Sequence, residues 1–154
     1  MNISISSLEK KHFPVMLEEV IQICNHPKKN QLIVDCTFGG GNYSKALLKF
    51  PNVKIIALDR DKSAIKRAES LKIKSSNQFN YFNEKFSNLD KIIKNENKPD
   101  IIIFDLGLST FQLQDYSRGF SFNSRDKIDM QMGLSDISAE EVSNTLDEKN
   151  LKLV

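Results

Sequence analysis

Carboxylate side chains follow three hydrophobic segments that this sequence predicts as strands. Asp35 lies near the end of residues 32–36, Asp59 follows Val53–Leu58, and Asp105 closes an apolar run that begins at Ile101. A carboxylate at a strand end can accept the two hydroxyls of a ribose, and it can also accept the hydrogens of an amine. These residue types therefore indicate a nucleoside site with an acid available for amine chemistry.

A run of three glycines, Gly39 to Gly41, follows the first of these segments and precedes an apparent helix. Glycine lets a backbone turn sharply and approach a ligand closely. The run does not match the dinucleotide fingerprint, because Ser44 stands at the third glycine position and Asp35-x-Thr37 is unusual for NAD binding. A ligand with a ribose but no pyrophosphate, such as S-adenosylmethionine, fits better. An NAD-dependent oxidoreductase is the less favoured alternative.

Hydrophobic segments and helical patterns alternate along most of the chain, which predicts an α/β fold with a parallel sheet. The expected strands are residues 32–36, 53–58, 79–83 and 101–105, the last a central strand buried on both faces. The expected helices are residues 14–24, 43–50, 61–71, 88–94 and 138–146, and one more that begins at Asp147. Ser138 and Glu141 are expected to form a capping box at the start of the helix over 138–146. Residues 106–134 show little periodicity, which is typical of a segment that is either functional or disordered.

Ligands of an open parallel sheet bind beyond the carboxyl ends of its strands. Asp35, Asp59, residues 83–86 and Asp105 all follow such ends, so we expect them to converge. Asp35 is as readily interpreted as an acid that caps the glycine turn. Asp105 either contacts an amine nucleophile or binds the amino group of a methionine moiety.

The loop of residues 105–110 is the candidate catalytic loop, because it combines a carboxylate, a glycine and two hydroxyls. Asp105 and Ser109 are its candidate catalytic residues. Phe86 is interpreted either as an aromatic wall for an adenine or as a core residue. His12 and His26 are isolated from any acid or serine at triad-like spacing, so neither is expected to serve nucleophilic catalysis.

Composition limits the partners and the location of the protein. The 154 residues are 40% hydrophobic, and 22 basic and 20 acidic residues leave a net charge of +2. We therefore expect one domain-sized core, and any RNA contact must be a local patch. The lysines and arginines of helix faces, among them Lys66 and Arg67, are expected to be mostly solvated, with phosphate contact as the alternative.

Cys24 and Cys36 are expected to be buried thiols, because they lie in apolar surroundings without metal-like spacing. No metal site is expected. No apolar run approaches the ~20 residues that cross a bilayer, and the first residues lack the apolar region of a secretory signal. The sequence therefore predicts a cytoplasmic protein without a membrane partner.

Six segments together resemble one known family, the bacterial methyltransferases that act on N4 of a cytosine in 16S ribosomal RNA. The segments are His12-Phe-Pro-Val-Met-Leu-Glu-Glu-Val20, Asp35-x-Thr-Phe-Gly-x-Gly41, Ala57-Leu-Asp-Arg-Asp61, Phe104-Asp-Leu-Gly-Leu-Ser-Thr-x-Gln-Leu113, Arg118-Gly-Phe-Ser-Phe122 and Ile128-Asp-Met-x-Met132. The resemblance implies a Rossmann-like S-adenosylmethionine-dependent fold, direct methyl transfer without a metal, and the small ribosomal subunit as partner.

The resemblance also assigns the cofactor site residue by residue. It implies that Gly41, Asn42 and Tyr43 contact the cofactor through the loop. Asp59 would contact the ribose, and Phe86 would flank the adenine. Asp105 and Gln112 would complete the cofactor site and border the cytosine pocket. The family usually has Gly-Gly-His where this chain has Gly41-Asn42-Tyr43, so the role of a histidine does not carry over.

Members of the resembled family are roughly twice as long and continue into a helical insertion and further strands. We therefore expect a mobile N-terminus over residues 1–11, a Rossmann-like S-adenosylmethionine-binding domain over 12–113, and a substrate-facing loop with the start of the insertion over 114–154. A sheet that stops after its fourth strand has an exposed edge, with which a second copy of the chain could pair to form a homodimer. The alternative function is a non-catalytic fragment that at most binds S-adenosylmethionine or RNA.

Overall fold

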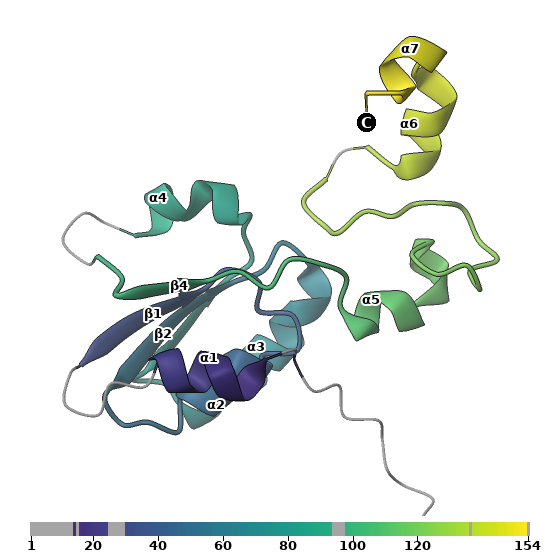
Figure 1. Ribbon diagram of the computed structural model, residues 1–154. Coiled ribbons are helices and arrows are strands. Elements are labelled where there is room, and N and C mark those ends of the chain that lie inside the picture. Colours follow the sequence, from purple (N-terminus) through teal and green to yellow (C-terminus); the bar gives the residue numbers. More distant parts are fainter. Residues whose placement is uncertain (1–13, 15, 25–29, 94–97, 136, 154) are drawn as a thin grey trace, which may run out of the picture.

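Four parallel strands form one sheet in a computed structural model that describes residues 14, 16–24, 30–93, 98–135 and 137–153 (Figure 1). The strands are β1 (Gln31–Asp35), β2 (Val53–Leu58), β3 (Phe79–Phe82) and β4 (Ile101–Ile103), in the order β3-β2-β1-β4. The predicted α/β fold with a parallel sheet is confirmed. The strand order reverses between β1 and β4, which is where an open sheet binds its ligand.

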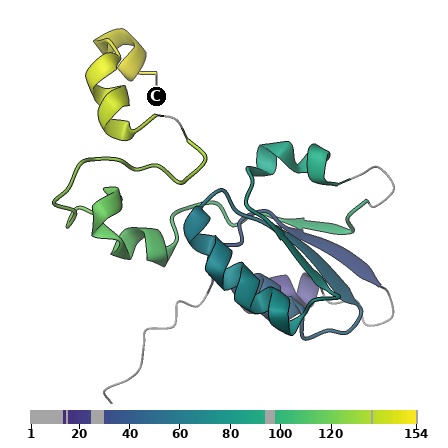
Figure 2. The ribbon, with the colours of Figure 1, turned by 180° about the vertical axis from the view of Figure 1, so that it is seen from behind.

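Helices cover both faces of this sheet (Figures 1 and 2). Three of them share one face: α1 (Leu17–Cys24), α2 (Asn42–Leu47) and α3 (Ile65–Lys74). The other face carries α4 (Leu89–Ile92), and short 3-10 turns, η1 (Lys62–Ala64) and η2 (Phe86–Asn88), precede α3 and α4. These elements match the expected helices within a few residues at each end.

The core consists of two clusters, because side chains alternate across the strands. The larger cluster lies under α1, α2 and α3, and its largest fully buried side chains include Ile33, Leu47, Ile55 and Phe79. The smaller cluster lies under α4 and consists of Val34, Cys36 and Leu58. Cys24 and Cys36 are both buried free thiols, as predicted.

The prediction that residues 101–105 form a central strand buried on both faces is wrong. Among the described strands, β4 pairs with β1 alone, and it is three residues long. Ile102 is 44% exposed and Phe104 is 50% exposed. A continuous apolar run does not reveal what covers it, so the pattern could not separate an edge strand from a central one.

Beyond β4 the chain leaves the sheet, and its described residues there form four short elements (Figure 1). They are α5 (Thr110–Gln114), η3 (Tyr116–Arg118), α6 (Ala139–Thr145) and α7 (Glu148–Leu151). The predicted capping box of Ser138 and Glu141 is present at α6, and Asp147 caps α7. The first of these elements, α5, was not expected, because its five residues are too few to show a helical period.

Two expectations concern residues outside the described ranges: the mobile N-terminus over residues 1–11, and the isolation of His12 and His26. Within the described ranges, no helix combines the length and the apolar character that crossing a membrane requires.

Candidate functional site

A pocket of about 630 Å³ opens at the carboxyl ends of the strands. Its walls come from the segments that follow β1, β2, β3 and β4, so the predicted convergence of four segments is confirmed. The lining includes Thr37 to Gly40, Asn42, Tyr43, Asp59 to Asp61, Glu84 to Ser87 and Asp105 to Gln112. A pocket of this size falls within the roughly 300–1,000 Å³ of small-molecule sites.

Asp59 is held rigidly at the wall that β2 contributes. One carboxylate oxygen accepts a hydrogen bond from the backbone N–H of Gly39 at 2.6 Å, and the other accepts one from the N–H of Asp61 at 2.8 Å. Burial raises the pKa of Asp59, and these two backbone hydrogen bonds oppose the rise. Each oxygen keeps a second lone pair, so the carboxylate can accept two further hydroxyl groups.

Asp35 lies beneath the pocket and does not line it. The side chain is 1% exposed, it accepts a hydrogen bond from Ser44 Oγ at 2.6 Å, and it accepts a longer one from the N–H of Thr37 at 3.3 Å. Burial is the main cause that raises the pKa of Asp35 to about 6, and hydrogen bonds from Ser44 and Thr37 oppose it. The interpretation of Asp35 as an acid that caps the glycine turn is therefore confirmed.

The glycine turn depends on Gly41 for its packing. Gly41 has φ of 71°, and a Cβ atom there would lie 2.5 Å from Cζ of Phe38. Phe38 is 3% exposed and its ring packs against the rings of Phe79 and Tyr81 at 5.8 and 5.4 Å. Gly41 is therefore required behind the loop, and it is not among the residues that line the pocket.

Asp105 lies two residues beyond β4, beside the segment that follows β1. Its backbone N–H donates to Oγ1 of Thr37 at 2.8 Å, which joins the loops that follow β4 and β1. The phenol of Tyr43 is hydrogen-bonded to the Asp105 carboxylate. Burial, followed by the charges of Asp105 and Asp35, raises the pKa of Tyr43, so the phenol stays protonated at neutral pH and donates to Asp105.

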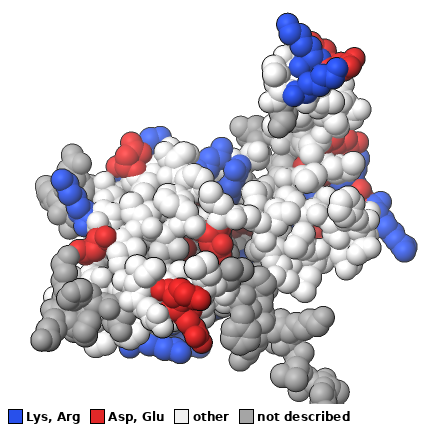
Figure 3. All heavy atoms as spheres, in the orientation of Figure 1, with Lys and Arg blue, Asp and Glu red and all other residues white. Residues whose placement is uncertain are grey.

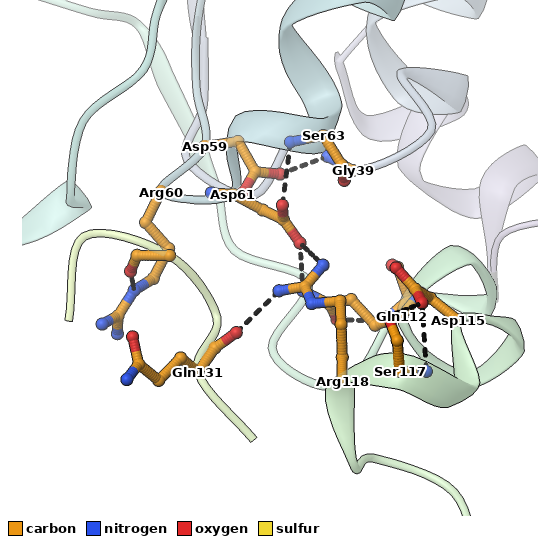
Figure 4. A network of polar contacts seen from close by, with 12 residues as sticks. Gly39, Asp59, Arg60, Asp61, Ser63, Gln112, Asp115, Ser117, Arg118 and Gln131 are labelled. Atoms are coloured by element: carbon orange, nitrogen blue, oxygen red, sulfur yellow. Dashed lines mark hydrogen bonds and ion pairs between the residues drawn. The ribbon is translucent and has the colours of Figure 1, made fainter. Parts of the chain in front are cut away.

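Gln112 and Ser109 are bound to each other at the start of α5. The side-chain oxygen of Gln112 accepts from the N–H of Ser109 at 2.9 Å, and the hydroxyl of Ser109 accepts from the N–H of Gln112 at 3.3 Å. The amide nitrogen of Gln112 donates to Oδ2 of Asp61 at 2.9 Å (Figure 4). Both side chains thus hold the loop of residues 105–110 beside the segment that carries Asp59.

Asp61 links the pocket wall to the chain that follows α5. Its carboxylate accepts from Ser63 N–H at one oxygen, and Arg118 and Gln112 donate to the other (Figure 4). Burial alone would raise the pKa of Asp61, but the hydrogen bonds from Arg118, Gln112 and Ser63 outweigh it and leave the pKa below its ordinary value. Asp61 is therefore a charged anchor.

The contacts of three residues at the site were missed, because no local pattern signals them. Arg67, expected to be solvated, donates to the carbonyl of Gly39 at 2.9 Å and lies 4.3 Å over the ring of Phe111. Arg60 donates to the carbonyl of Gly133 at 2.9 Å. Thr37 received no role, yet it positions Asp105. Each contact joins residues far apart in the sequence, and only the fold brings them together.

Phe86 lines the pocket and is 43% exposed. Its ring meets the ring of Phe104 edge to face, with centroids 5.4 Å apart. Asn42 and Tyr43 also line the pocket. Every predicted site residue except Gly41 therefore borders one cavity.

The model of the MraW methylase family matches residues 9–154. Ribosomal RNA small subunit methyltransferase H of Rickettsia canadensis (strain McKiel) is 42% identical over 144 residues, which are 94% of this chain and 46% of that protein. The protein of the same name from Rickettsia akari (strain Hartford) is 42% identical over 140 residues, 91% of this chain and 45% of that protein. The chain thus spans about half the length of the curated relatives it matches.

A solved structure from Clostridium thermocellum is 21% identical, with a TM-score of 0.48, over 58% of this chain and 48% of that one. This likeness is too distant to support an argument about the site.

Proposed function

We propose that this chain, which belongs to the MraW methylase family, forms the S-adenosylmethionine-binding part of a methyltransferase that acts on ribosomal RNA of the small subunit. The proposed acceptor is N4 of a cytosine in 16S ribosomal RNA. Residues 12–113 would bind the cofactor, and residues 114–154 would begin the part that faces the RNA.

The observation that carries this proposal is a pair of carboxylates that line one pocket beyond the ends of β2 and β4. Asp59 presents two oriented oxygens with free lone pairs, which suits the two hydroxyls of a ribose. Asp105 lines the same pocket, with its carboxylate bound by Tyr43. Phe86 adds an aromatic wall that suits an adenine. The residues therefore fit S-adenosylmethionine.

S-adenosylmethionine, when bound, supplies a methyl group on a positively charged sulfur. The exocyclic amine of cytosine is a weak nucleophile, because its lone pair is delocalised into the ring. A carboxylate that accepts hydrogen bonds from the amine holds the nitrogen in line and stabilises the positive charge that develops there as the N–C bond forms and the S–C bond breaks. It can then accept the proton that the methylated nitrogen loses. Asp105 is the residue we assign to this role, with Ser109 beside it in the same loop.

The loop that carries Asp105 is positioned by its neighbours. Thr37 holds the backbone of Asp105, and Gln112 holds Ser109 and Asp61 together. A base that is attacked here must leave its stack to enter the pocket. The cost of that step is lowest for a single-stranded or loosely paired nucleotide.

The experiment that tests this function measures cofactor binding and methyl transfer separately. Calorimetric titration of the protein with S-adenosylmethionine is expected to give micromolar binding that weakens at least thirtyfold in Asp59→Ala. Asp90→Ala, which removes an exposed acid of α4, is the matched control and should bind as the unaltered protein does.

Methyl transfer is then measured with radiolabelled cofactor, small-subunit particles and extracted RNA. Incorporation at a cytosine N4 would support the full proposal. Cofactor binding without incorporation on either substrate would favour the alternative of a non-catalytic binding unit. NAD binding that competes with S-adenosylmethionine would refute the cofactor assignment.

A further inference from the structure

A second groove, of about 600 Å³, lies between α2 and α3. Five of the nine residues that line it are cations, and none of the nine is an acid. The nine are Lys45, Leu48, Lys49, Lys66, Arg67, Ser70, Leu71, Lys74 and Ser75. In the parts of the chain that the structure describes, none of these five cations belongs to an ion pair. Glu69 lies on α3 but does not line the groove.

The cations of this groove repel one another. Burial lowers the pKa of Lys45, and the neighbouring charges of Arg67 and Lys74 lower it further. The chain carries a net charge of only +2, so this concentration is local. Figure 3 shows a narrow strip of basic side chains at the lower edge of this face, below a group of acidic ones, in the region where Figure 1 places α2. A ligand with several spaced negative charges would relieve the repulsion.

The groove adjoins the cofactor pocket through two of its cations. Arg67 lines both cavities, and its Nε donates to the carbonyl of Gly39. The amino group of Lys45 donates to the carbonyl of Gly40 at 2.7 Å. The groove therefore begins directly behind the glycine turn that forms one wall of the pocket.

We propose that this groove binds the phosphate backbone of the single-stranded RNA segment that flanks the base entering the pocket. The proposal rests on the proposed function for the base itself. A polynucleotide presents one anion per nucleotide, so it can engage cations that are spread along two helices. The floor formed by Leu48 and Leu71 offers apolar contact to ribose carbons. Such contacts fix the position of the RNA and carry no sequence preference.

The test compares two triple variants that lose the same charge. Lys49, Lys66 and Lys74 are exposed groove lysines, and they are replaced by alanine in the groove variant. The control replaces the exposed lysines Lys54, Lys72 and Lys91, which do not line the groove. Fluorescence anisotropy measures the affinity for a labelled single-stranded RNA of ~20 nucleotides at several salt concentrations.

The groove variant is expected to bind RNA at least tenfold more weakly. Its slope of log K against log salt should fall by about 2, because each lost phosphate contact removes about 0.7 for single strands. The control should stay within twofold of the unaltered protein. A Lys-to-Arg version of the groove variant should restore binding, since it keeps the charges. Equal weakening of both alanine variants, or no RNA binding by the unaltered protein, would overturn the proposal.

Calorimetry with S-adenosylmethionine separates this proposal from the proposed function. Groove-dependent RNA binding by a protein that binds no cofactor would refute the function and support the groove. If the protein binds S-adenosylmethionine but the groove variant binds RNA as tightly as the unaltered protein, only the groove proposal is refuted. Circular dichroism melting of each variant excludes a folding defect as the cause.

Discussion

Arg118 and Asp61, 57 residues apart in the sequence, form an ion pair in which Nη1 of Arg118 lies 2.6 Å from Oδ2 of Asp61. The same guanidinium donates to the carbonyl of Gln131 at 2.7 Å, so it also binds the returning chain. Gly133 lies against Arg60, and a Cβ atom at Gly133 would fall 2.4 Å from the Arg60 carbonyl oxygen. Residues 118–133 are thus fastened to the loop that carries Asp59.

Replacement of Arg118 by alanine is expected to destabilise this attachment. The carboxylate of Asp61 would lose its cation while it stays largely buried, which costs about 2 kcal/mol in the free energy of unfolding for a pair with this exposure. Urea denaturation measures that loss, and hydrogen exchange should increase first in residues 118–133. Arg125→Ala, an exposed arginine in the same segment, is the control. Unchanged exchange in Arg118→Ala would contradict the assigned role.

Gly41→Ala is expected to destabilise the protein by about 3 kcal/mol. The new Cβ atom would meet the buried Phe38 ring at 2.5 Å, and alanine rarely adopts φ of 71°. Gly40→Ala is the matched control, because a Cβ atom at Gly40 would lie 3.2 Å from its nearest neighbour, the Phe111 ring. The φ of Gly40 also lies outside the left-handed region. Thermal and urea unfolding of both variants measure the difference. Equal losses would show that the Phe38 contact does not decide the requirement for glycine.

The strands of the sheet could be predicted because their signals are local. Val53–Leu58 was predicted with its observed bounds, and the capping box at Ser138 and a helix starting at Asp147 were predicted from neighbouring residues. The apolar pattern of residues 101–105 did not reveal the edge position of β4, because pairing and exposure depend on which strands lie beside it. The exposed edge was expected only from the greater length of the resembled family. The helix α5 was missed because its five residues are too few to show a helical period.

The sequence predicted which segments form the candidate site, but it did not predict the contacts between them. Strand-end acids are visible in a sequence, and the topology of a parallel sheet brings them to one edge. The partners of those acids are not visible. The bonds of Asp61 to Arg118, of Asp105 to Thr37 and of Arg67 to the glycine turn cross 28 to 68 positions of sequence. Neither propensity nor periodicity predicts contacts of that range.

Tyr43→Phe is expected to slow methyl transfer about tenfold and to leave the fold intact. The variant keeps the buried ring but removes the hydroxyl that donates to the Asp105 carboxylate, and a hydrogen bond to a charged group contributes about 1.5 kcal/mol. Single-turnover kinetics with saturating S-adenosylmethionine measure the rate.

Tyr116→Phe, which alters a tyrosine that is 51% exposed, is the control for this test. Cofactor affinity should change little in either variant. A rate in Tyr43→Phe equal to that of the control would show that Asp105 needs no support from the phenol.

Asp35→Asn is expected to change how stability depends on pH. The pKa of Asp35 is about 6 in the folded protein, above the ordinary value of 3.8, so the folded state holds the proton over a range where the unfolded state has lost it. The contribution of Asp35 to stability is therefore fully present below pH 3.8 and is lost as the pH rises through 6. Between pH 4.5 and pH 7.5 this difference amounts to about 2 kcal/mol.

Asparagine keeps the shape of the side chain and cannot titrate, so it isolates this effect from the other carboxylates. The free energy of unfolding, measured in urea at both pH values, should fall by about 2 kcal/mol more in the unaltered protein than in Asp35→Asn as the pH rises from 4.5 to 7.5. Asp90→Asn, at an exposed position of α4, should behave like the unaltered protein. Parallel pH profiles for the unaltered protein and Asp35→Asn would mean that Asp35 is ionised in the folded protein even at pH 4.5, with Ser44 and Thr37 fully offsetting its burial.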